Sequence, residues 1–254
     1  MGVIYISVAF ILTIMHINLV PGVVGRIFAE AFDFTAIFGG FAGSCMMFGI
    51  KRGLYSNEAG VGSAPNAAAA ADVSHPVKQG LVQMLSVFID TLLICTATAF
   101  MCLSSGIEPT KELAGAPYVQ AALAASMGDY AKLFITVSMV LFAFTTLLGN
   151  LYYVDNAFAY VLKHVPGKTF TLCYRILACV LIFIGAGSSM GTMWDLADVT
   201  MGFMAIINLP VICILGGPAL RALDDYTEQR DAGKNPEFKA SKIGLTKKLD
   251  YWQD

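Results

Sequence analysis

Long apolar runs separated by short polar segments dominate this chain, and each run is close to the roughly 20 helical residues that cross a hydrocarbon core. The pattern predicts an all-α membrane protein with six spans, at residues 3–20, 35–50, 80–104, 131–153, 169–186 and 194–217. An Ala-rich stretch at 118–126 predicts a further short helix outside the spans. After Pro218 the chain becomes polar. We therefore expect a transmembrane domain over 1–220 and a mobile cytoplasmic tail over 221–254.

The second run is short and rich in glycine, with Gly39, Gly40, Gly43 and Gly49 inside it. A glycine in a helix interior costs about 1 kcal/mol relative to alanine. Backbone groups freed at membrane depth must be satisfied by protein or by a water-filled cavity. The run is therefore either a broken helix that lines a binding site or a helix that packs closely through small residues, and the spacing alone does not choose between them.

Composition supports the membrane assignment, because 57% of the 254 residues are hydrophobic and only 13% are charged. Soluble domains carry about 25% charged residues. The net charge of −2 gives no sign of nucleic-acid binding. The six cysteines all lie in apolar runs without a C-x-x-C pair, which indicates buried thiols rather than disulfides or metal ligands. The first run lacks a basic flank and a cleavage site, so we expect a retained span.

Lys and Arg predict the orientation, because cytoplasmic loops of membrane proteins carry an excess of them. If the N-terminus is cytoplasmic and the six spans alternate, thirteen of the sixteen Lys and Arg residues fall inside. Only Arg26, Lys111 and Lys132 fall outside. We therefore expect a multi-pass protein of the bacterial plasma (inner) membrane with both termini in the cytoplasm.

Residues 53–65, GLYSNEAGVGSAP, preceded by Lys51 and Arg52, resemble the signature of the sodium:alanine (alanine/glycine:cation) symporter family. The resemblance continues in HPVKQG, FIDT, FTTLLG, WDLAD and NLP, and it covers essentially residues 4–220. It implies a LeuT-type fold, in which two inverted repeats of five helices hold the substrate between the broken first and sixth helices. The six runs are similar to core helices 5–10 of that fold, which places 35–50 at the broken sixth helix.

Two features depart from the family pattern. Members of the family are nearly twice as long, and the first broken helix has no counterpart here, so the resemblance implies the C-terminal portion of a carrier, through truncation or a split reading frame. Residues 149–155, GNLYYVD, also differ from the family, which tends to have Trp or Ser before the tyrosines and Gly-Glu after them. The role of that helix end is therefore not transferred from the family.

The resemblance implies substrate binding at Gly39, Gly40, Phe41, Ala42, Gly43 and Trp194, and sodium binding at Thr145 and Thr146. Two half-helices that meet at an unwound segment offer N–H groups to a carboxylate and C=O groups to an ammonium or Na⁺. The alternatives are ordinary membrane chemistry. The glycines also suit close packing, Trp194 also suits an interfacial anchor, and a membrane threonine often hydrogen-bonds its own helix.

Acidic and loop residues form a second group of candidates. Asp90 lies inside the third run, and Asp195 and Asp198 share a helix face at the start of the sixth. An ionisable residue at membrane depth is by default a functional hypothesis, and a satisfied hydrogen-bond network is the alternative. Arg52, Asn57 and Glu58 belong to the signature, where Glu58 either pairs with Arg52 in an inner gate or folds the loop through turn chemistry.

The function expected from the resemblance is sodium-coupled symport of small neutral amino acids by alternating access, with the lipid bilayer, Na⁺ and the amino acid as partners. No cofactor is expected other than Na⁺ as the coupling ion, and no enzyme activity. One alternative is an inert half-carrier, or one that assembles with a separately made N-terminal half. A remote alternative is an intramembrane hydrolase built on the G-x-S-x-G sequence at 187–191.

Overall fold

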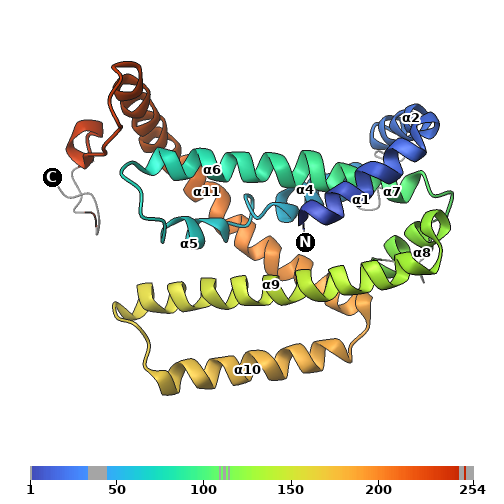
Figure 1. Cartoon of the computed structure of the whole chain (residues 1–254). Helices are drawn as coiled ribbons and strands as arrows, with labels where there is room; N and C mark the ends of the chain where they lie inside the picture. The colour runs from blue at the N-terminus through green and yellow to red at the C-terminus, as the bar shows by residue number, and fades with distance from the viewer. Residues whose placement is uncertain are drawn as a thin grey trace. The chain divides into compact units, whose positions relative to one another are not determined.

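The computed structural model describes residues 2–33, 45–108, 110, 113, 115–245 and 249, and every regular element within them is helical (Figure 1). The all-α class predicted from the sequence is confirmed for these residues. In chain order the elements are α1 (Gly2–Met15), the 3-10 turn η1 (Ile17–Leu19), α2 (Val20–Ala31), α4 (Cys45–Ser56), α5 (Ala64–Ala68), α6 (Pro76–Phe88), the π-helical segment η3 (Ile89–Cys95), α7 (Thr96–Leu103), α8 (Ala116–Met127), α9 (Asp129–Leu162), α10 (Lys168–Ala186), α11 (Met190–Asp231) and the 3-10 turn η4 (Ala240–Ile243).

The chain divides into two compact units, which are described separately. The first unit contains Met1–Ser56 and Phe88–Leu151, and the second contains Asn57–Val87 and Tyr152–Asp254. Helices α6 and α9 therefore each contribute residues to both units.

The core of the first unit lies between α1, α7, α8 and the start of α9. Tyr5 on α1 joins two of these helices, because its hydroxyl lies 3.0 Å from Thr98 Oγ1 on α7 and its ring packs edge-on against Phe142 of α9. The buried side chains include three alanines, whose small size allows close helix packing. The buried residues are Ala9, Leu12, Met101, Cys102, Ala122, Leu123, Ala131 and Ile135. Helix α8 also confirms the short helix predicted from the Ala-rich stretch.

Long apolar helices confirm a polytopic membrane protein. Within the described residues, four helical stretches are long and apolar enough to cross a bilayer: Pro76–Leu103, Asp129–Leu162, Lys168–Ala186 and Met190–Asp231. A fifth candidate is the pair Gly2–Met15 and Ile17–Ala31, which is bent by 74°. The predicted span at 35–50 lies mostly outside the described residues, so the count of six spans stays a prediction.

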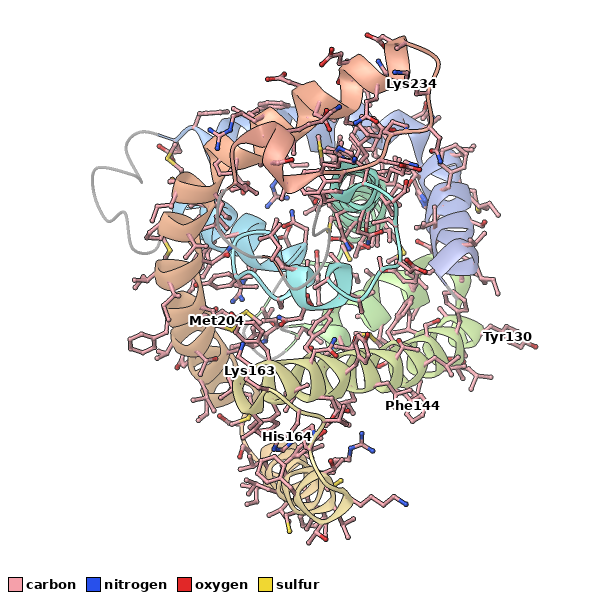
Figure 2. The ribbon with its side chains drawn as sticks, turned by 90° about the vertical axis from the view of Figure 1, so that its left-hand side faces the viewer. Tyr130, Phe144, Lys163, His164, Met204 and Lys234 are labelled. Carbon is pink, nitrogen blue, oxygen red and sulfur yellow. The ribbon has the colours of Figure 1, made fainter. Side chains whose placement is uncertain are left out.

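Exposed apolar side chains follow these helices. Tyr130 and Phe144 project outward from α9 (Figure 2), with 85% and 59% of their surfaces exposed. Helix α10 turns back beside the C-terminal end of α9 (Figure 1), where the ring of Phe158 packs against Phe170, and its apolar stretch is otherwise unburied in the structure. Surfaces of this kind suit a hydrocarbon environment rather than water.

The segment expected to be a mobile tail has defined structure over most of its length. Helix α11 continues through Pro210 and Pro218 to Asp231, far past the end of the predicted span. Beyond Gly233 the chain turns back, and Phe238, Ala240 and Ile243 bury their side chains against Ala222 of α11. Scattered apolar residues that look isolated in the sequence thus form a small core of their own.

Candidate functional site

The glycine-rich segment expected to bind substrate lies outside the part of the chain that the structure describes. This applies to Gly39, Gly40, Phe41, Ala42 and Gly43. The assignment of these five residues to the substrate site therefore stays a prediction, and the geometry of the candidate site comes from the motif that follows them.

Residues 57–63, which we call the signature loop, fold through turn chemistry. Asn57 Oδ1 accepts a hydrogen bond from the Ala59 amide at 3.1 Å, an interaction typical of an Asx turn. Glu58 has a positive φ of 59°, which is uncommon for a residue with a side chain. Its carboxylate accepts a hydrogen bond of 2.7 Å from the Ser63 hydroxyl, and its carbonyl accepts one from the Gly62 amide. The loop thus has an internally determined shape.

Asn208 on α11 holds the signature loop from outside. Its side-chain amide donates to the carbonyl oxygens of Ala59 and Gly60 at 3.2 and 3.0 Å. Gly62 lies against the same amide with a φ of +80°, and a Cβ at this position would overlap the Asn208 side chain. Gly62 therefore serves two needs at once, a left-handed backbone and a close approach to α11. Val61, between these contacts, is buried.

A second asparagine holds the chain just after the loop. Asn156 on α9 donates to the Asn66 carbonyl at 3.1 Å, and the Asn66 side chain donates back to the Ser63 carbonyl at 3.1 Å. Within the second unit, α9 and α11 thus contact the signature loop and the residues directly after it through neutral amides. Such bonds are directional but carry no charge, and a small displacement of either helix is enough to break them.

The predicted pair between Arg52 and Glu58 stays a prediction. Arg52 belongs to the first unit and Glu58 to the second. Within the second unit the Glu58 carboxylate contacts the Ser63 hydroxyl. The structure therefore shows how the turn is built, which is one of the two interpretations of Glu58, and leaves the other untested.

The threonines expected at a sodium site lie on the exposed surface of α9. Thr145 donates to the carbonyls of Leu141 and Phe142 within its own helix, at 3.1 and 3.0 Å. This is the local bond that a membrane threonine often makes. Thr146 is exposed beside it. A hydroxyl that donates to a carbonyl still offers its lone pairs, so this geometry neither supports nor opposes sodium binding.

The three candidate acids lie in different environments. Asp90 is half-buried and falls in the first turn of η3, where a π-helical stretch replaces the α-helix. Such stretches occur frequently at functional sites, and apolar periodicity gave no sign of this one. Asp195 is exposed and Asp198 half-buried at the start of α11, where Trp194 is 45% exposed. Asp90, Asp198 and Trp194 all have interaction partners.

The G-x-S-x-G sequence has a structural role. Ser189 is the N-cap of α11, and its Oγ accepts a hydrogen bond from the Thr192 amide at 3.2 Å. The same Oγ lies 2.7 Å from the Thr192 hydroxyl. This is standard N-cap chemistry, and it explains the serine without a nucleophile.

Sequence reasoning missed Asn156 as a site residue and noted Asn208 only as part of a motif. A signal existed for Asn208, because a side-chain amide within an apolar run is expensive unless another element satisfies it. The partner itself was not predictable, because the Ala59 and Gly60 carbonyls lie almost 150 positions earlier in the chain.

Comparison with known proteins gives a consistent result. The profile of the sodium:alanine symporter family matches residues 1–240. The amino-acid carrier protein AlsT of Bacillus subtilis (strain 168) is 43% identical over 254 residues, which is 100% of this chain and 54% of that protein. The sodium/proton-dependent alanine carrier protein of Bacillus sp. (strain PS3) is 39% identical over 268 residues, 100% of this chain and 60% of that protein. The sodium/alanine symporter AgcS of Methanococcus maripaludis is 37% identical over 233 residues, which is 91% of this chain and 50% of that protein. The chain thus spans about half the length of the curated relatives it matches.

Proposed function

We propose, from the premise that this chain belongs to the sodium:alanine symporter family, that it is part of a sodium-coupled carrier of small neutral amino acids. The relatives named as an alanine carrier and a sodium/alanine symporter support alanine or a similar amino acid as substrate and Na⁺ as coupling ion. Family membership also makes the protein a transporter rather than an enzyme.

The proposed architecture is the second part of a LeuT-type carrier, with six spans equivalent to core helices 5–10. Its support is the element order: a bent helical pair, a glycine-rich segment, and four long apolar stretches in sequence. In this arrangement residues 39–43 form the unwound part of a broken helix beside the substrate. Small side chains there leave room only for a small amino acid, and the exposed peptide groups complement its two charges.

Alternating access requires a contact on the cytoplasmic side that forms in one state and breaks in another. The observation that supports this role for the signature loop is its attachment to α11 through Asn208. In the proposed cycle the signature loop closes the cytoplasmic side of the substrate path while these two hydrogen bonds are formed. When they break, the Glu58 carboxylate leaves the Ser63 hydroxyl and pairs with Arg52. The surplus of Lys and Arg supports a cytoplasmic position for this loop and for both termini of the bacterial protein.

Uptake of labelled alanine tests the proposal in a bacterial strain that lacks its own alanine carriers. The chain is expressed alone and together with the N-terminal half of AlsT, each with NaCl or with choline chloride outside. The expected result is sodium-dependent uptake in at least one arrangement. Uptake only with the added half would establish the assembly-dependent carrier, because this chain spans half of its relatives. Sodium-independent or absent uptake in both arrangements, with the chain present in the membrane, contradicts the proposal.

A further inference from the structure

His75 is a fully buried titratable group in the second unit, directly before α6. Its Nδ1 accepts a hydrogen bond from the Val77 amide at 3.2 Å, so the imidazole proton resides on Nε2. Nε2 lies 3.4 Å from the Asp225 carboxylate on α11. The rings of Tyr226 and Phe238 pack edge-on against the imidazole, each at 5.2 Å between centroids. A neutral histidine thus lies where three chain segments meet.

Residues 235–245, which we call the strap, cover this histidine and bind the chain in front of α6. The Phe238 amide donates to the Ser74 carbonyl at 3.0 Å, and the Ser74 hydroxyl donates to the Pro236 carbonyl at 2.9 Å. Lys78 on α6 reaches the Asn235 side chain at 2.6 Å. Hydrogen bonds in both directions hold the two segments in register.

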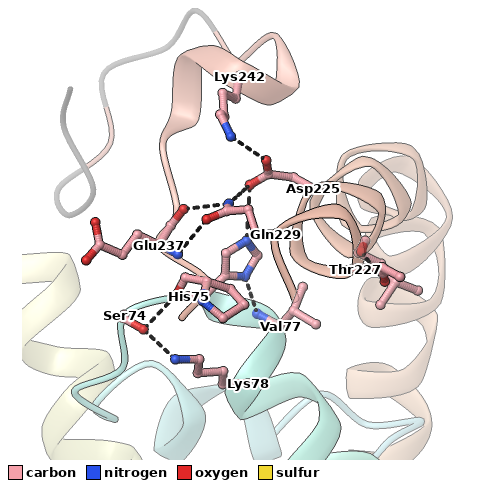
Figure 3. Close-up of polar contacts among 11 residues, drawn as sticks. Ser74, His75, Val77, Lys78, Asp225, Thr227, Gln229, Glu237 and Lys242 are labelled. Carbon is pink, nitrogen blue, oxygen red and sulfur yellow. Dashed lines mark hydrogen bonds and ion pairs between the residues drawn. The ribbon is translucent and has the colours of Figure 1, made fainter. Parts of the chain in front are cut away.

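The strap binds α11 with equal specificity. Gln229 forms a two-way pair with the backbone of Glu237, donating to its carbonyl at 2.9 Å and accepting from its amide at 3.0 Å (Figure 3). Arg221 donates to the Ile243 carbonyl at 2.9 Å. Buried apolar side chains of the strap complete the contact with Ala222. The strap therefore connects the beginning of one long helix to the end of another.

We propose that the strap clasps α6 to the C-terminal end of α11 while His75 is neutral, and that protonation of His75 releases it. The second proton has to bind Nδ1, which faces the Val77 N–H donor, so that hydrogen bond is lost. The resulting charge lies in a site closed to water and lined by two aromatic rings. An opened strap lets water solvate the imidazolium, and the protonated state therefore favours opening.

The charges around His75 agree with this direction. Burial is the largest influence and lowers the pKa of His75 below its ordinary value, whereas Asp225 raises it. Lys78 from α6 and Lys242 from the strap lower the pKa further. Because the closed strap depresses the pKa, the strap is fully stable above the ordinary histidine pKa of about 6.5 and weakens as the pH falls below it. Release of the strap in this way does not require the proposed transport activity.

Hydrogen exchange of the full chain in detergent micelles tests the strap without any transport measurement. The readout is the protection of the Glu237 and Phe238 amides, corrected for intrinsic exchange, at about pH 7.5 and about pH 5.5. We expect protection to fall by about threefold to tenfold at the lower pH. The upper value is the limit when a single proton binds only the open state and the pH is one unit below the ordinary histidine pKa. Equal protection at the two pH values overturns the proposal.

Variants separate titration from simple packing. His75→Gln keeps an N–H donor toward Asp225 but cannot titrate, so the loss of protection at low pH should disappear. His164→Gln, the same change at an exposed histidine, should leave it intact. Asp225→Asn keeps an oxygen beside His75 and removes the charge that favours the imidazolium, so the loss should grow toward about tenfold. A His75→Gln chain with wild-type pH dependence, or an Asp225→Asn chain with a smaller one, contradicts the release mechanism.

Discussion

Gly62 packs directly against the side-chain amide of Asn208, with its backbone in the left-handed region and no room for a Cβ. The contact joins a turn near the start of the second unit to the middle of its longest helix. It also explains why a glycine is needed there: any other residue meets both a strained φ and an occupied space.

Gly62→Ala should therefore destabilise the protein by at least about 1–3 kcal/mol, the range for a side chain forced into such a backbone. The measurement is thermal unfolding of the purified chain in detergent. Gly80→Ala is the matched control, because Gly80 lies in α6 with open space around it, and alanine there should stabilise the helix by about 1 kcal/mol. Equal effects of the two substitutions would mean that the Gly62 contact is absent in solution.

Asn208→Leu should release the signature loop, because it removes both hydrogen bonds to the Ala59 and Gly60 carbonyls. Carbonyls left without a partner cost about 1–3 kcal/mol. Hydrogen exchange across residues 57–63 should become faster in the variant. Asn150→Leu, the same change on an exposed face of α9, should leave exchange in the loop unaltered. Unchanged protection of the loop in Asn208→Leu would show that other contacts hold it.

Ser138→Ala should stabilise the protein by about 1 kcal/mol, because the Ser138 hydroxyl is buried and has no hydrogen-bond partner among the described residues. Ser104→Ala is the natural comparison. Ser104 is also buried, but its hydroxyl donates to the Phe100 carbonyl at 2.6 Å, so its loss should destabilise. Guanidinium-induced unfolding measures both, and a destabilised Ser138→Ala chain would reveal a partner for that hydroxyl outside the described residues.

Tyr5 substitutions should separate the polar and aromatic parts of the contact between α1 and its neighbours. Tyr5→Phe removes the bond to Thr98, which retains its own bond to the Ile94 carbonyl, so the cost should be only about 0.6 kcal/mol. Tyr5→Ala also removes the ring that packs on Phe142 and should cost about 3–5 kcal/mol. Thermal unfolding of the two variants measures both costs. Equal destabilisation by Tyr5→Phe and Tyr5→Ala would contradict this division into a polar and an aromatic part.

Gly40→Leu should abolish sodium-dependent alanine uptake by the assembled carrier while the amount of protein in the membrane stays normal. The reason is the proposed pocket, which a leucine side chain would fill. Gly22→Leu is the control, because Gly22 lies in α2 with open space around it. Normal uptake by the Gly40→Leu carrier would show that the glycines serve packing alone.

The hydrophobic pattern of the sequence predicted the long helices but not the contacts between distant segments. The apolar runs were sufficient for α9, α10 and the first part of α11, because a helix that buries nothing must still satisfy its own backbone in lipid. They were insufficient for the contact of Asn208 with Gly60 and for the strap over His75, because these contacts join residues 148 and 162 positions apart. The π-helical turn at Asp90 was not predictable either, because the sequence around it is apolar at most positions and shows no clear helical period.

The signature motif contributed more than the periodicity did. It singled out residues 53–65 from the order of their amino acids alone. In the structure Asn208 of α11 holds the signature loop, and Asn156 of α9 holds Asn66 directly after the motif. The substrate residues expected at 39–43 remain a prediction, because they lie outside the described residues and rest on the glycine pattern and the family resemblance.

Pro210 and Pro218 both lie on α11 between the residue that holds the signature loop and the residue that holds the strap. Neither can donate a backbone bond to the preceding turn, and Gly216 and Gly217 stand directly before the second proline. Helix α11 therefore bends most easily between Asn208 and the residues that bind the strap. A bend there would move the C-terminal end of α11 together with the strap, while the part of α11 that binds the signature loop through Asn208 keeps its position.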